Sequence, residues 1–444
     1  MRSGLFIRKA ILTLIYLAIP VLVVVLWHNN YLQRQTDGFT NIQTEIGRLT
    51  GLLGVVCLLL QLMLAGRVSW IERLFGMDRL LFIHHLNGFL TILFLAAHPV
   101  FLAWGFSLNG ETTFVEQYKE LLKWEGVKQA AAGLGILIII TLLSVVLIKK
   151  LLKYEAWYYI HLLAYLALGL TFIHQIKTGS DLINDPAMLN LWYGLYGFAL
   201  GNIIFFRFMK PLIAFFIHRF NVKKIVKESD DAVSVYIGGI NMQNFDFLPG
   251  QFVKVRFLTK GYQWESHPFS ISEAFSGKHL RLTIKNSGDF TAKAGGIPEG
   301  TSVIIDGPHG TMTSDAAGKS EILLIAGGIG ITPLRSLAEE FLKTGKKVTL
   351  LYSTRTKNGI VFKDELEQMK AEKNLNLHYI ITDNSKMEAE HGKLDGDKLK
   401  KLVPDCKDRD VFLCGPPPMM KSTVKILRKL GAKKSSIHWE RFAL

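Results

Sequence analysis

One apolar run, residues 80–104, constrains this chain more than any other stretch of its sequence (LLFIHHLNGFLTILFLAAHPVFLAW). The run contains no Asp, Glu, Lys or Arg. At about 1.5 Å of rise per residue, a helix of this length crosses a bilayer core of about 30 Å. The run also contains His84, His85 and His98. Because a buried imidazole without a partner costs free energy, these histidines require a partner.

A second apolar run, residues 157–176, repeats the pattern with His161 and His174 (WYYIHLLAYLALGLTFIHQI). Each of the two predicted membrane helices carries one histidine near either end. This arrangement predicts two metal or haem sites stacked across a membrane. Ordinary helix packing is the alternative for any one of these histidines, but matched pairs on two helices favour ligands.

Apolar residues are concentrated in the first 210 of the 444 residues, and the remainder resembles an ordinary soluble protein. A chain of this length allows two or three domains. We interpret the first apolar segment as a retained helix and not as a signal peptide, because no small-residue cleavage site follows it. Six candidate spans lie at about 10–27, 49–66, 80–104, 130–148, 157–176 and 191–209.

Lysine and arginine are unevenly distributed among the predicted loops. One set of loops carries nine (Arg2, Arg8, Lys9, Arg67, Arg73, Arg79, Lys149, Lys150, Lys153) and the other five (Arg34, Lys119, Lys123, Lys128, Lys177). The positive-inside rule therefore predicts a multi-pass protein of the cell membrane with both termini in the cytoplasm. The net charge of +15 fits this basic face. No nucleic-acid motif is present, so we expect the lipid bilayer and not nucleic acid as a partner.

Helical phase selects among the histidines. His84 and His98 are 14 residues apart, about four turns, so they project from one face, whereas His85 lies on another. The predicted direction of the spans pairs His84 with His161 on the cytoplasmic side and His98 with His174 on the outer side. His161 and His174 are about 140° apart on a straight helix, so a kink or a changed helix crossing must absorb the difference. No acidic or thiolate residue lies nearby in sequence, which favours haem over zinc.

The sequence pattern changes after residue 210. Residues 210–220 (KPLIAFFIHRF) are amphipathic and basic, which predicts a connector on the inner membrane surface. From about residue 221, short alternating runs predict a small antiparallel barrel. Its turns at 248–252, 267–272 and 285–291 offer donors suited to a pyrophosphate, and Phe269 could pack on a flavin ring. The three cysteines, Cys57, Cys406 and Cys414, form no CxxC pair, which places this half in a reducing compartment.

Strand and helix patterns alternate from residue 316. A buried strand (EILLIAGG) runs into a glycine-rich turn and a helix, which suits a dinucleotide phosphate. A tight turn alone is the alternative for some of the glycines. The residues of this turn and helix start are Gly327, Gly328, Gly330, Thr332 and Pro333. The next strand ends in Ser353-Thr354-Arg355, where Arg355 favours the 2′-phosphate of NADPH over NADH.

In this order the motifs resemble one family. His-Pro-Phe-Ser at 267–270, followed by Lys-Asn-Ser-Gly-Asp-Phe-Thr at 285–291, is similar to the FAD-binding domain of the ferredoxin–NADP reductase type. The version in NADPH oxidases and ferric reductases is the most similar. The paired histidines resemble the transmembrane domain of the same superfamily, so the resemblance covers about 80–444. It implies a six-helix transmembrane bundle, then an antiparallel β-barrel FAD domain and an α/β Rossmann-like NAD(P) domain.

The resemblance also implies roles for single residues. Those expected at the isoalloxazine and ribityl parts of FAD are His267, Pro268, Phe269 and Ser270, and those expected at its pyrophosphate are Lys285, Gly288 and Thr291. Lys285 keeps the charge but not the bidentate fork of the arginine that many relatives have. Cys414, with Gly415 and Pro416, would lie beside the nicotinamide. Phe442 would stack on the flavin, although two residues follow it.

These expectations define an electron path. NADPH passes a hydride to FAD, and electrons continue through a b-type haem at His84/His161 and a second at His98/His174 to an acceptor outside. The motifs of the soluble half favour oxygen, giving superoxide, with a ferric chelate as the alternative. A haem-binding electron-transfer subunit or sensor, and a flavin reductase merely anchored by helices, are further alternatives. We expect the domains to span 1–210, 211–220 as a linker, 221–315 and 316–444.

Overall fold

The computed structural model describes residues 2–36, 41–110, 112–144, 154–383 and 390–440. The chain divides into two compact units, Met1–Val68 with Arg79–Ile204, and Ser69–Asp78 with Phe205–Leu444. We call the first the helical unit and the second the sheet unit. The sequence placed the first boundary at residue 210, whereas the units divide between Ile204 and Phe205. The segment Ser69–Asp78, which the sequence left among the membrane spans, belongs to the sheet unit.

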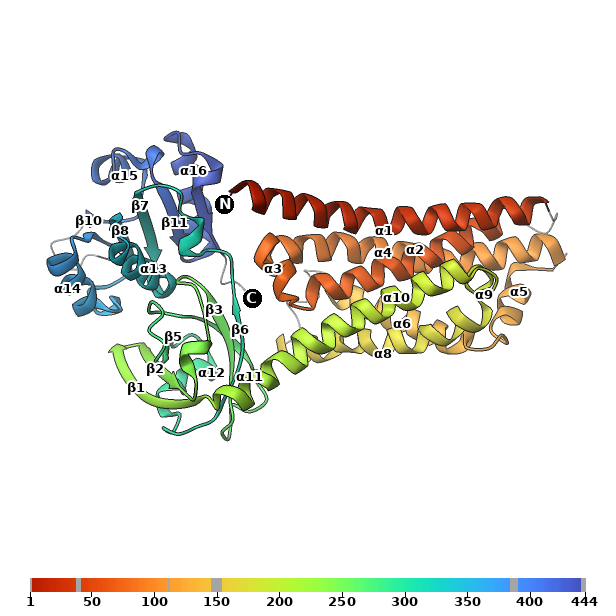
Figure 1. Cartoon of the computed structure of the whole chain (residues 1–444), viewed down its shortest axis with the longest axis horizontal. Coiled ribbons are helices and arrows are strands. Elements are labelled where there is room, and N and C mark those ends of the chain that lie inside the picture. Colours follow the sequence, from red (N-terminus) through yellow and green to blue (C-terminus); the bar gives the residue numbers. More distant parts are fainter. Residues whose placement is uncertain (1, 37–40, 111, 145–153, 384–389, 441–444) are drawn as a thin grey trace. The chain divides into compact units, whose positions relative to one another are not determined.

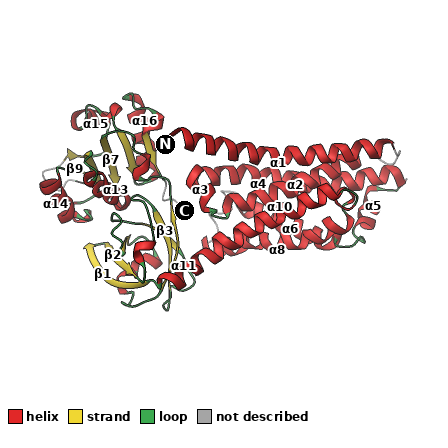
Figure 2. Ribbon diagram, in the orientation of Figure 1, coloured by secondary structure: helices red, strands yellow, loops and turns green. Residues whose placement is uncertain are grey.

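Long apolar helices make up the helical unit (Figures 1 and 2). Within the described residues, six helices are long and apolar enough to cross a membrane, which confirms the expected six-span bundle. The long helices are α1 (Arg2–Thr36), α2 (Ile42–Ala65), α4 (Met77–Gly110), α6 (Val127–Ser144), α8 (Tyr154–Thr178) and α10 (Pro186–Ile203), with the short α5 (Phe114–Leu121) and α9 (Ser180–Ile183). Lys149, Lys150 and Lys153 lie outside the described residues.

Glycines on α2 allow α4 to approach closely. A Cβ at Gly47 would lie 2.8 Å from the backbone nitrogen of Leu102, and one at Gly54 would lie 2.6 Å from Cδ2 of Leu95. Small residues at such positions allow two membrane helices to pack backbone against backbone. Glycines at positions 47 and 54 therefore allow a short distance between α2 and α4, because neither residue has a side chain that would separate the helices.

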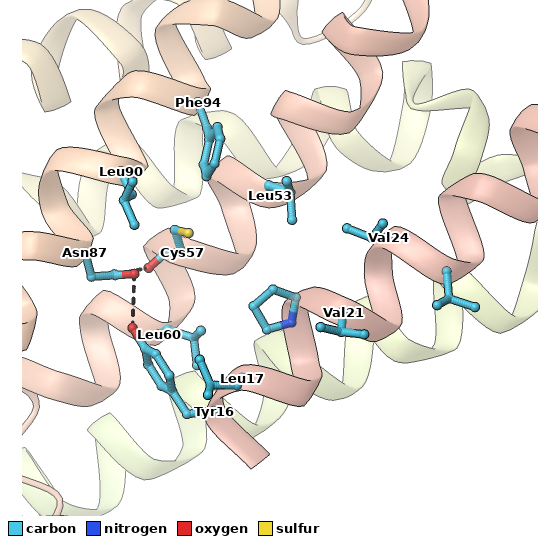
Figure 3. A pocket seen from close by; sticks show the side chains of 12 residues that line it. Tyr16, Leu17, Val21, Val24, Leu53, Cys57, Leu60, Asn87, Leu90 and Phe94 are labelled. Atoms are coloured by element: carbon cyan, nitrogen blue, oxygen red, sulfur yellow. Dashed lines mark hydrogen bonds between the residues drawn. The ribbon is translucent and has the colours of Figure 1, made fainter. Parts of the chain in front are cut away.

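Figure 3 shows an apolar cavity of about 410 Å³ between α1, α2 and α4. Its lining is aliphatic and aromatic apart from one polar cluster. There the Tyr16 hydroxyl donates to Asn87 Oδ1 at 3.2 Å, and Asn87 Nδ2 donates to the Cys57 carbonyl at 2.8 Å. These polar groups satisfy one another inside the bundle, which the low dielectric of a membrane requires.

Helix α10 continues beyond Ile203. A π-helical segment (η1, Ile204–Met209) leads into α11 (Lys210–His218). Pro186–His218 is therefore one apolar helical stretch of 33 residues. Most of the connector expected at 211–220 is helical and continuous with the sixth span. The π-helical segment begins at Ile204, where the two units divide.

Two antiparallel sheets form the first half of the sheet unit, with strand orders β1-β2-β5 and β4-β3-β6. They share an apolar core in which Val235, Phe257 and Leu282 are fully buried. This confirms the expected antiparallel domain. Its elements are β1 (Asn221–Ser229), β2 (Ala232–Gly238), β3 (Phe252–Phe257), β4 (His267–Ser270), β5 (Leu280–Lys285), α12 (Asp289–Ala292) and β6 (Val303–His309), and the unit also contains α3 (Ser69–Phe75).

A parallel sheet forms the second half, with strand order β10-β9-β8-β7-β11-β12, which confirms the expected α/β domain. The strand order reverses beside β7, so the carboxyl ends of β7 and β11 mark the usual ligand position. The elements are β7 (Glu321–Gly327), α13 (Ile331–Lys343), β8 (Lys347–Thr354), α14 (Lys363–Lys373), β9 (Asn376–Ile381), β10 (Glu390–His391), α15 (Gly396–Leu402), β11 (Asp410–Cys414), α16 (Pro417–Lys429) and β12 (Ile437–Trp439).

A cluster of charged side chains joins the two halves of the sheet unit. Arg281 of β5 is buried and donates to both carboxylate oxygens of Glu365 of α14, at 2.5 and 3.1 Å. Arg335 of α13 donates to the same carboxylate at 2.9 Å. Glu339 of α13 accepts from the backbone nitrogen of Ala274 at 3.0 Å. One shared network therefore fixes the antiparallel domain against α13 and α14.

Candidate functional site

The four histidines predicted as ligands form two pairs, each between α4 and α8. The ring centres of His84 and His161 lie 6.1 Å apart, and those of His98 and His174 lie 6.4 Å apart. Helix α8 is unbroken from Tyr154 to Thr178. The 13-residue spacing of His161 and His174 does not require a break in α8. Both rings reach α4 because of the way in which α8 packs against it.

The separation within each pair suits a metal ion between two imidazoles. A metal–imidazole bond is about 2 Å and a ring nitrogen lies about 1 Å from the ring centre, so two axial imidazoles have ring centres about 6 Å apart. No group of three or more His, Cys, Asp or Glu in the described ranges is placed to hold a metal ion. The protein would need to supply only two ligands to a haem, and each pair offers two imidazoles that could hold one.

Backbone carbonyls of α2 orient the two rings of α4. Nδ1 of His98 lies 2.7 Å from the carbonyl oxygen of Gly47, and Nδ1 of His84 lies 3.3 Å from that of Gln61. A contact of this kind fixes the ring and leaves Nε2 as the nitrogen for a metal, as in most histidine-ligated sites. The carbonyls of α2 therefore set the orientation of one histidine ring in each pair.

The two rings of α8 have different surroundings. Nδ1 of His161 lies 3.5 Å from Ser144 Oγ, which also accepts from Trp157 Nε1 at 3.2 Å. Nδ1 of His174 is buried, and among the described residues it forms no hydrogen bond of good geometry, although the backbone of Thr171 in its own helix lies close to the ring. A buried imidazole in this state is costly unless the ring is stabilised by another interaction, such as ligation.

Two glycines make room for the His98/His174 pair. A Cβ at Gly51 of α2 would lie 2.5 Å from His98 Nδ1. Gly126 has a φ of +79°, and a Cβ there would lie 2.8 Å from the backbone nitrogen of His174. A larger residue at either position would move a histidine, so the pair depends on these glycines.

His85 joins neither pair. Its ring is exposed, and its Nδ1 lies 2.6 Å from the carbonyl oxygen of Leu81 in its own helix. Its ring centre is 6.0 Å from that of its neighbour His84, but the two rings are nearly perpendicular, at 88°. This placement agrees with the helical phase, which assigned His85 to another face.

The two flavin motifs meet at an aromatic cluster. His267, Pro268, Phe269 and Ser270 form β4. The ring centre of Phe290, in the second motif, lies 4.0 Å from that of His267. It lies 6.2 Å from that of Phe269, with the rings 21° from parallel. Sequence motifs alone assigned Phe290 no role of its own, yet its ring contacts the motif expected at the isoalloxazine from within the motif expected at the pyrophosphate.

The residues expected at the pyrophosphate already have protein partners. Lys285 forms an ion pair with Asp231 at 3.0 Å. Thr291 Oγ1 accepts from the backbone nitrogen of Ser287 at 2.8 Å and donates to the carbonyl of Gly288 at 3.1 Å. Thr291 therefore closes the turn that begins α12, and the charge of Lys285 is shared with a carboxylate.

Close packing of two strand ends accounts for the glycine-rich turn. A Cβ at Gly330 would lie 2.4 Å from the carbonyl oxygen of Cys414, and one at Gly415 would lie 3.0 Å from the Cα of Gly327. Gly328 has a φ of +53°, which favours glycine. The glycines are therefore needed where the turns after β7 and β11 touch, beside the usual ligand position of such a sheet.

The other expected nucleotide residues surround this turn. Thr332 Oγ1 donates to the Ile329 carbonyl at 3.0 Å, and Pro333 is buried in the first turn of α13. Ser353 pairs with Gly327 in the register of β7 and β8. Arg355 is exposed just beyond the end of β8. Pro416 precedes α16, and Phe442 lies outside the described residues.

One carboxylate that the sequence did not single out, Glu440, lies near Cys414. It accepts hydrogen bonds from the backbone nitrogens of Thr311 and, at 3.1 Å, of Met312. Burial raises the pKa of Glu440, and burial with the charge of Glu440 raises the pKa of Cys414 well above its usual value. Burial of this kind favours the neutral Cys414 thiol over the thiolate. The only sequence signal for Glu440 was an acidic residue just after the last strand.

Three family models match the chain in succession. Residues 50–172 match the ferric reductase like transmembrane component, 239–313 an FAD-binding domain and 324–425 an oxidoreductase NAD-binding domain. These three matches, in this order, agree with the ferric reductase/NADPH oxidase superfamily. The chain is a multi-pass membrane protein with FAD-binding and NAD(P)-binding domains of the oxidoreductase type.

Curated relatives match this chain over part of their length. Flavohemoprotein A of Dictyostelium discoideum is 28% identical over 243 residues, which cover 50% of this chain and 59% of that protein. A flavohemoprotein of Candida albicans is 31% identical over 50% of this chain and 58% of its own. A plasma membrane-associated coenzyme Q6 reductase of Saccharomyces cerevisiae is 28% identical over 44% of this chain and 65% of its own. The chain thus spans about three-fifths of these relatives.

Among solved structures, the FAD/NAD-binding domain of a nitric oxide dioxygenase from Vibrio cholerae is similar, with a TM-score of 0.47 and 26% identity. The match covers 50% of this chain and 97% of that one. A flavohemoglobin from Malassezia yamatoensis has a TM-score of 0.47 and 19% identity, over 91% of this chain and 100% of that one.

Proposed function

We propose that the chain transfers electrons from cytoplasmic NADPH, through FAD and two b-type haems, to an acceptor on the other side of the membrane. The observation that carries this proposal is the two histidine pairs between α4 and α8, with ring centres 6.1 and 6.4 Å apart. When bound, FAD takes a hydride from the nicotinamide and releases electrons singly, and haem carries single electrons.

The chain's own residues supply position and orientation. Helices α4 and α8 hold the paired imidazoles, and the α2 carbonyls fix the rings of α4. The aromatic cluster of β4 and Phe290 offers a flat apolar surface for the isoalloxazine. The turns after β7 and β11, with the N-terminus of α13, offer backbone donors for the dinucleotide phosphates.

A reduced absorption spectrum tests the proposal. The full-length protein, purified in detergent and supplied with haem, is expected to show a low-spin cytochrome b spectrum with two haems per chain. His84→Leu and His98→Leu should each remove one haem. His85→Leu is the matched control and should retain both, because His85 joins neither pair. Protein without reducible haem absorption would contradict the proposal.

For the acceptor, we propose oxygen reduced to superoxide, as the motifs of the sheet unit favour. Ferric chelate is the second candidate, because residues 50–172 match a ferric reductase like transmembrane component. The test compares superoxide-dismutase-sensitive cytochrome c reduction with reduction of a ferric chelate, both driven by NADPH. A ubiquinone analogue forms a third arm, since one relative is named a coenzyme Q6 reductase. The acceptor with the highest kcat/KM decides between them.

Two further measurements examine the path itself. NADPH-driven acceptor reduction that is unchanged in His174→Leu would favour direct reduction by the flavin, or a role as a haem-binding subunit or sensor.

The proposed cytoplasmic location of both termini rests on the lysine and arginine bias. A reporter that is active only in the cytoplasm should be active when it is fused to the C-terminus, and a reporter that is active only outside should be inactive there. Activity of the outside reporter alone would reverse the proposed direction of electron flow.

A further inference from the structure

Helix α13 is attached to the antiparallel domain at two backbone amides. The amide of Gly250 donates to Ser336 Oγ at 3.0 Å, and the amide of Ala274 donates to Glu339 Oε2 at 3.0 Å. Both acceptors belong to α13, which begins at Ile331 directly after the glycine-rich turn. The helix that follows the expected phosphate site is therefore bonded directly to the flavin half of the same compact unit.

Both attachment points lie close to the carboxyl end of β4. Gln251, the residue after Gly250, accepts from the amide of Ile271, the residue after β4, at 2.9 Å. Ala274 follows three residues later. At Gly250, where φ is +95°, a Cβ would lie 3.3 Å from Leu337 Cδ1, so α13 approaches the backbone closely. Helix α13 therefore holds the end of the strand that is expected at the isoalloxazine.

A charged network completes this attachment, with Glu365 of α14 at its centre. Arg281 of β5 donates to both oxygens of the Glu365 carboxylate, at 2.5 and 3.1 Å, and to the Ser272 carbonyl at 3.0 Å. Arg335 of α13 donates to the same carboxylate at 2.9 Å and forms an ion pair with Glu339. Bidentate pairs of arginine and carboxylate fix geometry as well as adding energy. Glu365 therefore links one guanidinium from each half of the unit.

Phe362, the residue before α14, fixes the position of Arg281 from another side. Its φ of +61° is a backbone conformation that bulky residues rarely adopt. The ring is buried, and its centre lies 4.6 Å from the guanidinium carbon of Arg281, as in a cation–π contact. A residue in a sparsely populated conformation persists only where its surroundings determine it. The α/β domain therefore holds Arg281 in one position.

We propose that Glu339 and Glu365 are positioning residues for hydride transfer, which hold β4 and the start of α13 in one fixed arrangement. The inference rests on the flavin and nicotinamide part of the proposed function, and it assigns alignment to two carboxylates outside both cofactor motifs. Hydride transfer oxidises NADPH and reduces FAD by two electrons, so the two rings must meet in a defined geometry. A misplacement of about 1 Å costs about a hundredfold in rate.

The test measures flavin reduction in the full-length protein, loaded with FAD in detergent and mixed anaerobically with increasing NADPH. Glu339→Ala removes the acceptor of the Ala274 amide, and Glu365→Gln removes the charge that two arginines share. Each should lower the limiting rate per bound flavin by about tenfold or more. The NADPH concentration that gives half of this rate should stay within about twofold of the wild type, because nucleotide binding is not the altered step.

Two further variants and an isotope serve as controls. Asp405→Asn breaks an arginine–carboxylate pair within the α/β domain (Arg409 Nε to Asp405 Oδ2, 2.9 Å) and should leave the limiting rate unchanged. Arg281→Lys keeps the charge but loses the fork, so it should lower the rate less than Glu365→Gln. Deuterium at the transferred position of NADPH should slow the reduction, which identifies hydride transfer as the measured step. Unchanged limiting rates in Glu339→Ala and Glu365→Gln would overturn the proposal, as would a loss confined to NADPH affinity.

Hydrogen exchange separates this inference from the proposed function. The segments 248–252 and 272–276 contain the two amides that donate to α13. They should exchange at least about tenfold faster in Glu339→Ala and in Glu365→Gln than in the wild type. Unchanged exchange in both variants would overturn the attachment, even if one variant binds FAD poorly. Wild-type flavin that neither NADPH nor NADH reduces would contradict the proposed function and the positioning role with it, while exchange would still decide the attachment.

Discussion

At the scale of single residues, the His98/His174 pair depends on positions that carry no side chain. We predict that Gly51→Ala displaces the His98 ring, because the added Cβ would lie 2.5 Å from Nδ1. Purified Gly51→Ala should hold one haem per chain instead of two, as measured by the pyridine haemochrome. Gly169→Ala in α8 is the control, because a Cβ there meets nothing within 4 Å. Two haems in Gly51→Ala would show that the pair tolerates the methyl group.

The choice between NADPH and NADH is also a property of one side chain. Arg355 is exposed beyond the end of β8, where a 2′-phosphate would bind. We predict that Arg355→Gln lowers kcat/KM for NADPH about tenfold to a hundredfold, from the roughly 1.5–3 kcal/mol of a charged hydrogen bond. The value for NADH should change little. Arg428→Gln removes an exposed arginine of α16 and should affect neither. Equal losses for both nucleotides would exclude recognition of the 2′-phosphate by Arg355.

At the scale of elements, the charged network between β5, α13 and α14 holds the two nucleotide-binding domains together. Arg281 is 3% exposed and Glu365 is 34% exposed, so the pair is only partly screened by solvent. We predict that Glu365→Gln destabilises the folded sheet unit by about 1–3 kcal/mol, less than the loss of a fully buried pair. The measurement is the urea midpoint of flavin release from the full-length protein.

Glu321→Gln provides the comparison for that network. It breaks the ion pair between Glu321 and Lys347, whose side chains are 32% and 81% exposed. Exposed pairs contribute about 0–1 kcal/mol, so the midpoint should move little. A shift as large as that of Glu365→Gln would mean that the network contributes no more than a surface charge pair.

The elements themselves were largely predictable from sequence, because their signals are local. Apolar runs without charge located the six spans, and strand alternation followed by strand–helix alternation located the two nucleotide-binding folds. Helical phase also separated His84 from His85. The same phase did not explain how His161 and His174 both reach α4, because that depends on how two whole helices cross.

Long-range contacts were not predictable in this way. Nothing in the sequence near Glu72 indicates that it meets His309, which lies 237 positions away. The partner of Lys285, Asp231, and the role of Glu440 at Thr311 likewise arise only when separate strands come together. Hydropathy assigned Ser69–Asp78 to the membrane half, because a short loop between two spans carries no signal of its distant partner.

At the scale of the whole molecule, the chain crosses between its two units three times, after Val68, Asp78 and Ile204. The first two crossings flank Ser69–Asp78, and inside the sheet unit Glu72 of this segment forms a buried triad with His309 and Asp306 of β6. The third passes through the continuous helical stretch from α10 to α11. The attachment of Ser69–Asp78 to β6 therefore depends on a buried ionisable group, and its stability should depend on pH.

The sign of that dependence follows from the raised pKa of His309. The folded protein favours the imidazolium, so its stabilisation is complete below the usual histidine value of 6.5 and is lost as pH rises through the raised pKa. Glu72 and Asp306 face the ring directly, while Lys210 and Arg73 lie near these carboxylates. A neutral ring donates from one nitrogen only, so one carboxylate loses the hydrogen bond that it accepts from the ring.

We therefore predict that the hydrogen-exchange protection of the amides of Ser69–Asp78 and of β6, corrected for the intrinsic exchange rate at each pH, is constant from about pH 6 up to the raised pKa and then falls. In His309→Gln, which has no imidazole to titrate, this protection should be low and independent of pH. Protection that rises with pH in the wild type would contradict the prediction. The same slope in both proteins would assign the pH dependence to a group outside the triad.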